Sequence, residues 1–362
     1  MSGSTAAVAS RPMASTTLLL VVGPGRSGTS TLAGALSKLG AHVPGPYLNA
    51  NESNPKGFFE SAWSVAFHNR ILKRGPMNLA DARPEAGQVF EDAVTAKDRE
   101  ELAAYLAEQR GDHDLMVLKD PRLVWSVSLF QSVAAELDMD LAAMVMLRDP
   151  AEVVASRMEY YRKPSSEQAA AGYQARDLAG WVNTLATCEL ATRDIPRSFI
   201  SYHDLLGDWR GTMGRALQDV PVQLSVPEAG EQHEIDDFID PSLNRHQAGW
   251  PQDSAVPDDL RELTERTWGL CAKLTADAGS AEATRSELDE VRAQYARLYD
   301  IARALAHDEI VAEVAKVKRS RPAASKPGQP VRPPASRARR ARSAVARRLP
   351  PTVVERLKKV RR

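Results

Sequence analysis

The stretch VVGPGRSGTST, residues 21–31, decides which fold this chain is expected to adopt. Gly23 and Gly28 have the spacing of a phosphate-binding loop, G-x-x-x-x-G-K-[ST], but Thr29 occupies the lysine position. Arg26 lies three residues earlier. Backbone amides and the following helix N-terminus can hold an anion without a lysine. The loop therefore predicts an anion-binding site without the lysine that contacts the γ-phosphate of a nucleoside triphosphate in ordinary P-loops.

The segments on either side of this loop predict a strand and a helix. Residues 18–22 are a short apolar run, and residues 31–39 have helical apolar spacing that ends at Gly40. Further strands are expected at 115–118, in the run LAAMVML and at 198–202. Strands that alternate with helices predict a parallel sheet covered on both faces. The expected class is α/β, a P-loop nucleotide-kinase-like sheet with a C-terminal helical extension and a disordered basic tail.

The charge of the chain is divided unevenly along its length. The 362 residues include 47 Lys or Arg and 47 Asp or Glu, but residues 316–362 hold 17 of the bases and one acid. An acidic body thus precedes a basic tail, in which Pro, Arg, Ala and Ser predict disorder. The last residues, TVVERLKKVRR, have an amphipathic pattern. An anionic membrane surface is one partner that this tail leaves open.

The expected organisation is a disordered leader (1–14), a main domain (15–275), a long helix (276–318) and the basic tail (319–362). Leu288, Val291 and Tyr295 begin an apolar stripe of one to two heptads. Two interpretations of this stripe stay open. The helix packs on its own domain, or it forms a coiled coil in a homodimer.

Cysteine use and hydropathy point to the cytoplasm. Cys188 and Cys271 have no metal-binding spacing, and free cysteines are typical of a reducing compartment. The apolar run 18–22 is too short to cross a membrane. We expect a cytoplasmic protein that needs no metal, with peripheral membrane contact left open.

The loop also resembles that of sulfotransferases that use 3′-phosphoadenosine-5′-phosphosulfate. Their phosphosulfate loop reads [KR]-S-G-[TS]-[TS], matched here by residues 26–30, RSGTS. The family holds the 3′-phosphate of this donor with a strand-end Arg and a Ser eight residues later, as in Arg148 and Ser156 of LRDPAEVVAS. The donor-binding residues implied by the resemblance are Gly25, Arg26, Ser27, Gly28, Thr29, Ser30, Arg148 and Ser156.

Two further motifs extend the resemblance over about residues 17–250. NPKGFFE, residues 54–60, is similar to N-P-x-G-x-x-E of bacterial sulfotransferases that act on carbohydrates and lipids, and LKDPR, residues 118–122, matches a strand-end turn. The late R-K-G-x-x-G-D-W-K motif of cytosolic sulfotransferases is missing from the sequence. Arg245 and His246, in the weaker echo FIDPSLNRH, are candidates to complete the 3′-phosphate site. The departure favours the hydroxyl of a glycan, glycolipid or secondary metabolite as acceptor.

Glu60 is the expected general base, with Phe58 and Phe59 keeping the site dry. The competing interpretation is that Glu60 only begins the helix after Ser61. His68 is the rival base, because cytosolic sulfotransferases use a histidine.

Arg26 and Lys119 are expected to contact the 5′-phosphate and the transferring group, and Asp120 to orient Lys119 or its neighbour Arg122. Two other functions remain open. In a P-loop kinase, Ser30 and Asp120 would hold magnesium while ATP donates phosphate, although the missing lysine argues against it. In a non-catalytic module, the basic tail would be the working part.

Overall fold

The computed structural model describes residues 15–52, 54–244, 249–250, 256–276 and 282–320. The expected leader, Arg245, His246 and the tail from residue 321 lie outside the described residues.

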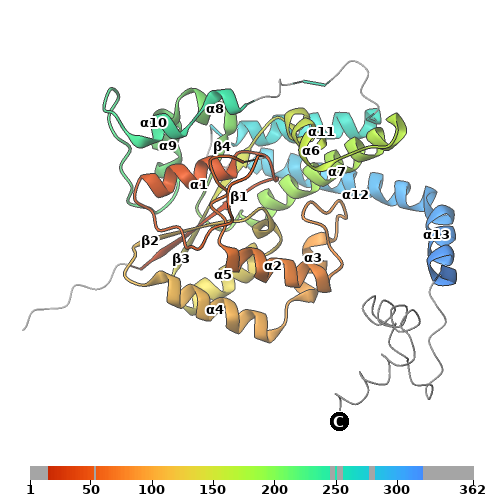
Figure 1. The fold of residues 1–362 in the computed structure, drawn as a ribbon, viewed down its shortest axis with the longest axis horizontal. Coiled ribbons are helices and arrows are strands. Elements are labelled where there is room, and N and C mark those ends of the chain that lie inside the picture. Colours follow the sequence, from red (N-terminus) through yellow and green to blue (C-terminus); the bar gives the residue numbers. More distant parts are fainter. Residues whose placement is uncertain (1–14, 53, 245–248, 251–255, 277–281, 321–362) are drawn as a thin grey trace, which may run out of the picture. The chain divides into compact units, whose positions relative to one another are not determined.

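A four-stranded parallel sheet organises the fold, with the strand order β2-β1-β3-β4 (Figure 1). Its strands are β1 (Thr17–Val22), β2 (Leu115–Lys119), β3 (Asp140–Leu147) and β4 (Arg197–Ser201). Every pairing is parallel, so all four strands end at the same edge. The expected α/β class with a parallel sheet flanked by helices is confirmed.

Both faces of the sheet are buried, which explains why its strands are apolar without alternation. Successive side chains of a strand point to opposite faces. Leu18, Leu20 and Val22 accordingly join one core cluster, while Leu19 and Val21 join another.

The helices separate into two groups that cover these faces (Figure 1). One face is covered by α2 (Ala62–Arg74), α3 (Ala86–Ala93), α4 (Ala96–Arg110), the 3-10 turn η1 (Pro121–Trp125), α5 (Val127–Glu136), α7 (Glu167–Ala191), α11 (Asp258–Lys273) and α12 (Glu282–Leu305). The other face is covered by α1 (Thr29–Lys38), α8 (Tyr202–Gly207), α9 (Trp209–Gln218) and α10 (Glu234–Phe238).

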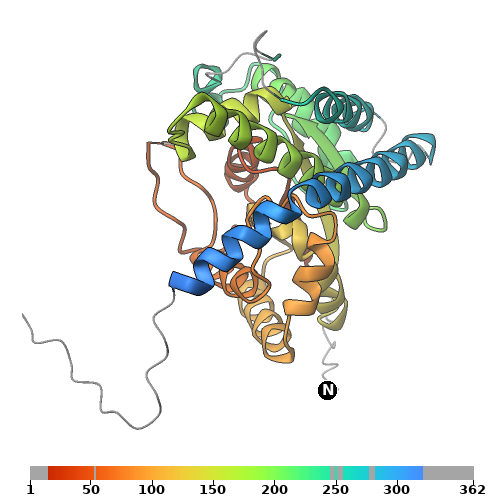
Figure 2. The ribbon, with the colours of Figure 1, turned by 90° about the vertical axis from the view of Figure 1, so that its right-hand side faces the viewer.

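The connections at the carboxyl edge of the sheet prepare the site. α1 and α2 are joined by a long segment, 39–61, whose described residues form only isolated bridges (Figure 2). After β3, the side chain of Asp149 accepts hydrogen bonds from two backbone amides and begins α6 (Pro150–Tyr161). A short 3-10 turn, η2 (Pro241–Leu243), follows α10.

The first half of the predicted apolar stripe belongs to the main core. Leu288, Val291 and Tyr295 of α12 are at most 4% exposed, and the hydroxyl of Tyr295 donates a hydrogen bond to the carbonyl of Ala82. Leu305, at the end of α12, is 82% exposed. The helix therefore packs against its own domain over this half.

Contacts divide the chain into two compact units, Met1–Ala304 and Leu305–Arg362. The second unit contains α13 (His307–Ser320), on which Ile310, Val311 and Val314 are exposed. Among the residues that the structure describes, no helix combines the length and the apolarity that a membrane span requires.

The packing of α12 predicts that Leu288→Ala lowers the free energy of unfolding by about 2–5 kcal/mol, because it opens a cavity in the core. Leu305→Ala, the same change on an exposed position, is the control and should cost less than about 0.5 kcal/mol. Denaturant unfolding of both variants measures the difference. Equal stabilities would mean that α12 does not belong to the folding unit of the sheet.

Candidate functional site

A cavity of about 550 Å³ opens at the carboxyl edge of the sheet. Its walls come from the loop after β1, the ends of β2 and β3, helix α6 and the segment between α1 and α2. This is where ligands bind in open α/β sheets. Segments far apart in the sequence thus meet around one space.

The glycine loop has one position, Gly28, at which a side chain would not be tolerated. Gly28 has φ +90°, and a Cβ atom there would lie 2.2 Å from the ring of Tyr202. Gly28 also precedes the first turn of α1, so the free amides of that turn face the cavity end of the helix. A Cβ on Gly25 would instead meet its nearest atom only at 3.7 Å, on Arg157. The loop forms a cradle suited to an anion.

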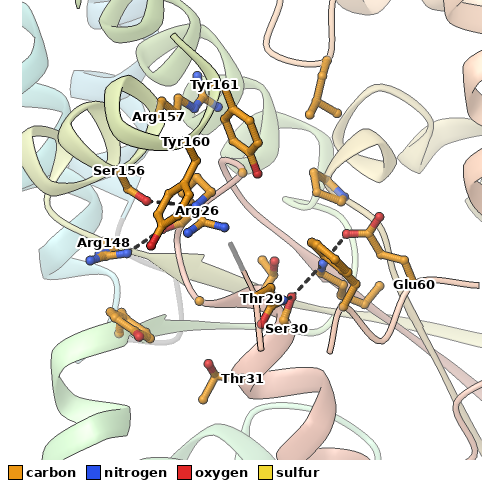
Figure 3. Close-up of a pocket in the computed structure, with 18 of the residues that line it drawn as sticks. Arg26, Thr29, Ser30, Thr31, Glu60, Arg148, Ser156, Arg157, Tyr160 and Tyr161 are labelled. Atoms are coloured by element: carbon orange, nitrogen blue, oxygen red, sulfur yellow. Dashed lines mark hydrogen bonds and ion pairs between the residues drawn. The ribbon is translucent and has the colours of Figure 1, made fainter. Parts of the chain in front are cut away.

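Arg148 and Ser156 both meet the loop, although they belong to a different strand–helix unit (Figure 3). Nε of Arg26 donates a hydrogen bond to Oγ of Ser156 at 2.9 Å. Nη1 of Arg148 donates to the carbonyl oxygen of Arg26 at 3.0 Å, while its Nε binds Glu152 at 2.8 Å. Arg26, Arg148 and Ser156, three of the eight residues predicted for donor binding, therefore meet in the lining of the cavity.

Glu60 and Lys119 form a buried ion pair that also reaches the loop. Nζ of Lys119 lies 2.5 Å from Oε1 of Glu60 and donates to Oγ of Ser30 at 3.1 Å. Glu60 is 5% exposed and Lys119 is 3% exposed. Burial lowers the pKa of Lys119, and the attraction of Glu60 offsets only part of that effect. The pair places a carboxylate and a cation together beside the first turn of α1.

Asp120 and His68 lie behind this wall and do not line the cavity. The oxygens of Asp120 accept from Nη1 of Arg122 at 2.8 Å and from Oγ of Ser64 at 3.1 Å. Burial alone would raise the pKa of Asp120, but His68 and Arg122 lower it below its usual range. His68 is fully buried, with Nδ1 2.8 Å from the carbonyl of Ser64 and Nε2 2.9 Å from Oγ of Ser126. The arrangement orients Arg122 and keeps His68 away from a ligand.

The two phenylalanines before Glu60 point in different directions. Phe58 lines the cavity. Phe59 packs against Phe238 and Tyr47, at centroid distances of 5.7 and 5.8 Å. Only Phe58 is therefore placed to keep water from the Glu60 carboxylate.

Sequence reasoning missed a group of α6 side chains that follow Ser156 directly. Arg157, Tyr160 and Tyr161 line the cavity, and the guanidinium of Arg26 lies 5.0 Å from the ring centroid of Tyr160. Positions 157, 160 and 161 are three and four residues apart, so they share one face of a helix. This spacing, read outward from Ser156, was the available signal.

The charge of the cavity favours an anionic ligand. Among the described residues, eight Lys or Arg side chains line it against four carboxylates, Glu52, Glu60, Asp177 and Asp240. Gly25 leaves room in the loop for a ligand, and Arg26, Arg148 and Arg157 line the same cavity. The residues present therefore fit a ligand with more than one phosphate group.

The geometry of the loop predicts that Gly28→Ala destabilises the protein by roughly 2 kcal/mol or more, because it adds a left-handed φ and a clash with Tyr202. Gly25→Ala should cost less than about 1 kcal/mol, since its Cβ would make only ordinary van der Waals contacts, the nearest at 3.7 Å. Thermal or denaturant unfolding compares the two alanines. A Gly28→Ala variant as stable as Gly25→Ala would contradict this loop conformation.

Comparison with known proteins completes the description of the site. No protein-family model and no curated protein matches the sequence. Among solved structures, a sulfotransferase domain from the Synechococcus PCC 7002 olefin synthase is similar at 15% identity with a TM-score of 0.40, covering 69% of this chain and 94% of that domain. A sulfotransferase domain from the curacin biosynthetic pathway is similar at 15% identity with a TM-score of 0.34, covering 71% and 98%. At these values the likeness assigns no activity by itself.

Proposed function

We propose that the protein is a sulfotransferase that moves a sulfuryl group from 3′-phosphoadenosine-5′-phosphosulfate to a hydroxyl group. The observation that carries the proposal is the meeting of Arg26, Arg148 and Ser156 at a glycine loop that has no lysine. Two arginines and a hydroxyl at one end of the cavity, with a cation and a carboxylate at the other, suit a donor that carries phosphate at two positions.

The residues divide between the two ends of the donor. Arg148 and Ser156 hold the 3′-phosphate. Arg26, with the amides of the first turn of α1 and the hydroxyls of Thr29 and Ser30, holds the 5′-phosphosulfate. A planar guanidinium binds a phosphate through two parallel hydrogen bonds, which gives direction as well as strength.

Glu60 takes the proton of the acceptor hydroxyl. The acceptor oxygen forms a bond to sulfur as the bond from sulfur to the bridging phosphate oxygen breaks, and that electron pair stays on the phosphate. Lys119, hydrogen-bonded to Ser30 and paired with Glu60, stabilises the negative charge that develops there. The cavity supports this assignment because Glu60 lines it and His68 does not.

Phosphate transfer from magnesium-bound ATP is less well supported. It needs a cation reaching the γ-phosphate, and Thr29 stands at that position. It also needs a metal ligand such as Asp120, whose oxygens accept hydrogen bonds from Arg122 and Ser64 behind the cavity wall.

The acceptor that the sequence motifs favour is a glycan, a glycolipid or a secondary metabolite.

The proposal predicts that 3′-phosphoadenosine-5′-phosphate raises the melting temperature more than ATP with magnesium does. A ligand at about 100 times its Kd stabilises the folded state by about 2.7 kcal/mol. For a domain of this size, that corresponds to a shift of roughly 4–5 °C. A larger shift with ATP and magnesium would overturn the assignment of the donor.

A second test is incubation of the protein with the sulfated donor and candidate acceptors. The accurate mass of the product should show that the acceptor gained SO₃ rather than HPO₃.

Removing the proposed base should slow turnover and spare donor binding. Glu60→Gln is expected to lower kcat by about 10²–10⁴-fold, the usual contribution of general base catalysis. The Kd of 3′-phosphoadenosine-5′-phosphate should not rise, because Lys119 stays in place. Glu52→Gln removes another carboxylate of the cavity and is the control, with kcat retained. Near-normal turnover in Glu60→Gln, with loss in His68→Asn, would show that His68 is the base.

A further inference from the structure

The guanidinium of Arg157 lies at the wall of the cavity, where no described residue accepts a hydrogen bond from it. Arg157 is 6% exposed and lines the cavity on α6. Within the described part of the chain, its sole ionic contact is Asp177, 3.8 Å from Nη1, which is beyond hydrogen-bond distance. Asp177 instead accepts two hydrogen bonds from Arg162, at 3.1 and 2.5 Å. The donors of Arg157 are therefore not satisfied by the described residues.

Arg148 provides an internal comparison, because it is also 6% exposed. Its Nε, Nη1 and Nη2 donate to Glu152, to the carbonyl of Arg26 and to Asn244 at 2.6–3.0 Å. Buried donors are nearly always hydrogen-bonded, and a buried cation needs a partner. Burial lowers the pKa of Arg157 despite the attraction of Asp177, which indicates an incomplete ion pair. Arg157 is thus a largely buried cation that has an ion pair with Asp177 but no hydrogen-bond acceptor among the described residues.

Arg157 lies beside Gly25 of the donor loop, on the side of the cavity opposite Glu60 (Figure 3). Its Nη2 lies 3.7 Å from the Cβ position of Gly25, and that same position lies 3.9 Å from Pro121. Figure 3 shows Arg157 on the α6 side, across the cavity from Glu60. Tyr160 and Tyr161 flank it on the same helix. Arg157 therefore faces the space between the loop and the end of β2.

We propose that Arg157 binds an oxyanion of the acceptor, so that the acceptor carries a carboxylate, phosphate or sulfate group in addition to its hydroxyl. The inference rests on the proposed function and specifies its substrate class. The guanidinium fork of Arg157 matches the geometry of these oxyanions. The rings of Tyr160 and Tyr161 supply surface for the organic part of the acceptor.

A matched set of small phenols tests this inference on the full chain saturated with 3′-phosphoadenosine-5′-phosphate. The anionic probes are 4-hydroxybenzoate, 4-hydroxybenzenesulfonate and 4-hydroxyphenylphosphonate, and the neutral probe is 4-hydroxybenzamide. Calorimetric titration should show at least one anion binding about tenfold more tightly than the amide, as expected for a charge-assisted hydrogen-bonded pair. The anion that binds most tightly identifies the group.

Arg157→Met should reduce that preference to about twofold or less, while the Kd of the nucleotide stays within about twofold. Arg99→Met is the control, since Arg99 lies outside the cavity and binds Ser132 and Glu136. It should retain the full preference. If Arg157→Met does not fold, Arg157→Lys keeps the charge but loses the fork, and should lose part of the preference.

The outcomes separate the inference from the function on which it rests. The inference about Arg157 is overturned if the wild-type protein binds none of the anions more tightly than the amide. It is also overturned if Arg157→Met keeps the full preference for the anion. A nucleotide Kd raised about tenfold or more in Arg157→Met would assign this arginine to the donor instead. Failure of the wild-type protein to bind the nucleotide at all would contradict the proposed sulfotransferase. The anion preference, titrated without nucleotide, would then still decide whether Arg157 forms an anion site.

Discussion

The parallel pairing of β1 between β2 and β3 is the constraint on which the site depends. Val21 pairs with Lys119, the last residue of β2, and with Met144 of β3, and all three strands run in the same direction. The glycine loop after β1, the cation at the end of β2 and the arginine after β3 therefore share one edge of the sheet. A displaced strand would move one of these groups away from the others. The pairing of the strands thus determines which side chains can meet in the cavity.

The charged side chains around the cavity are largely buried, and this determines how they are arranged. Burying an unpaired charge costs several kcal/mol, so the buried ions around the site come in pairs, such as Glu60 with Lys119 and Arg148 with Glu152. These pairs hold donors in place before a ligand arrives, which is the condition for electrostatic stabilisation of a transition state. Arg157 is paired with Asp177 at 3.8 Å but has no hydrogen-bond acceptor among the described residues, and a bound anion would supply one.

Local patterns located most of the candidate site because its residues lie at strand ends and helix starts. Arg148 and Ser156 were found from their spacing, and the structure brings both to Arg26. The same patterns could not decide whether Glu60 or His68 is the base, because Glu60 comes just before α2 and His68 lies within it. Only packing shows that Glu60 reaches the cavity, whereas His68 lies among Ser64 and Ser126.

By itself, the sequence determined the alternation of strands and helices, the glycine loop between the first strand and the first helix, and the division between an acidic body and a basic tail. These features depend on neighbouring residues, which hydropathy period and glycine spacing record directly. The tertiary structure decided that Leu288 and Val291 of α12 join the main core, that Phe59 turns away from Glu60 and that Arg157 stands without a hydrogen-bond acceptor in the described chain. Each of these depends on contacts between residues distant in sequence, and no local pattern encodes which surfaces meet.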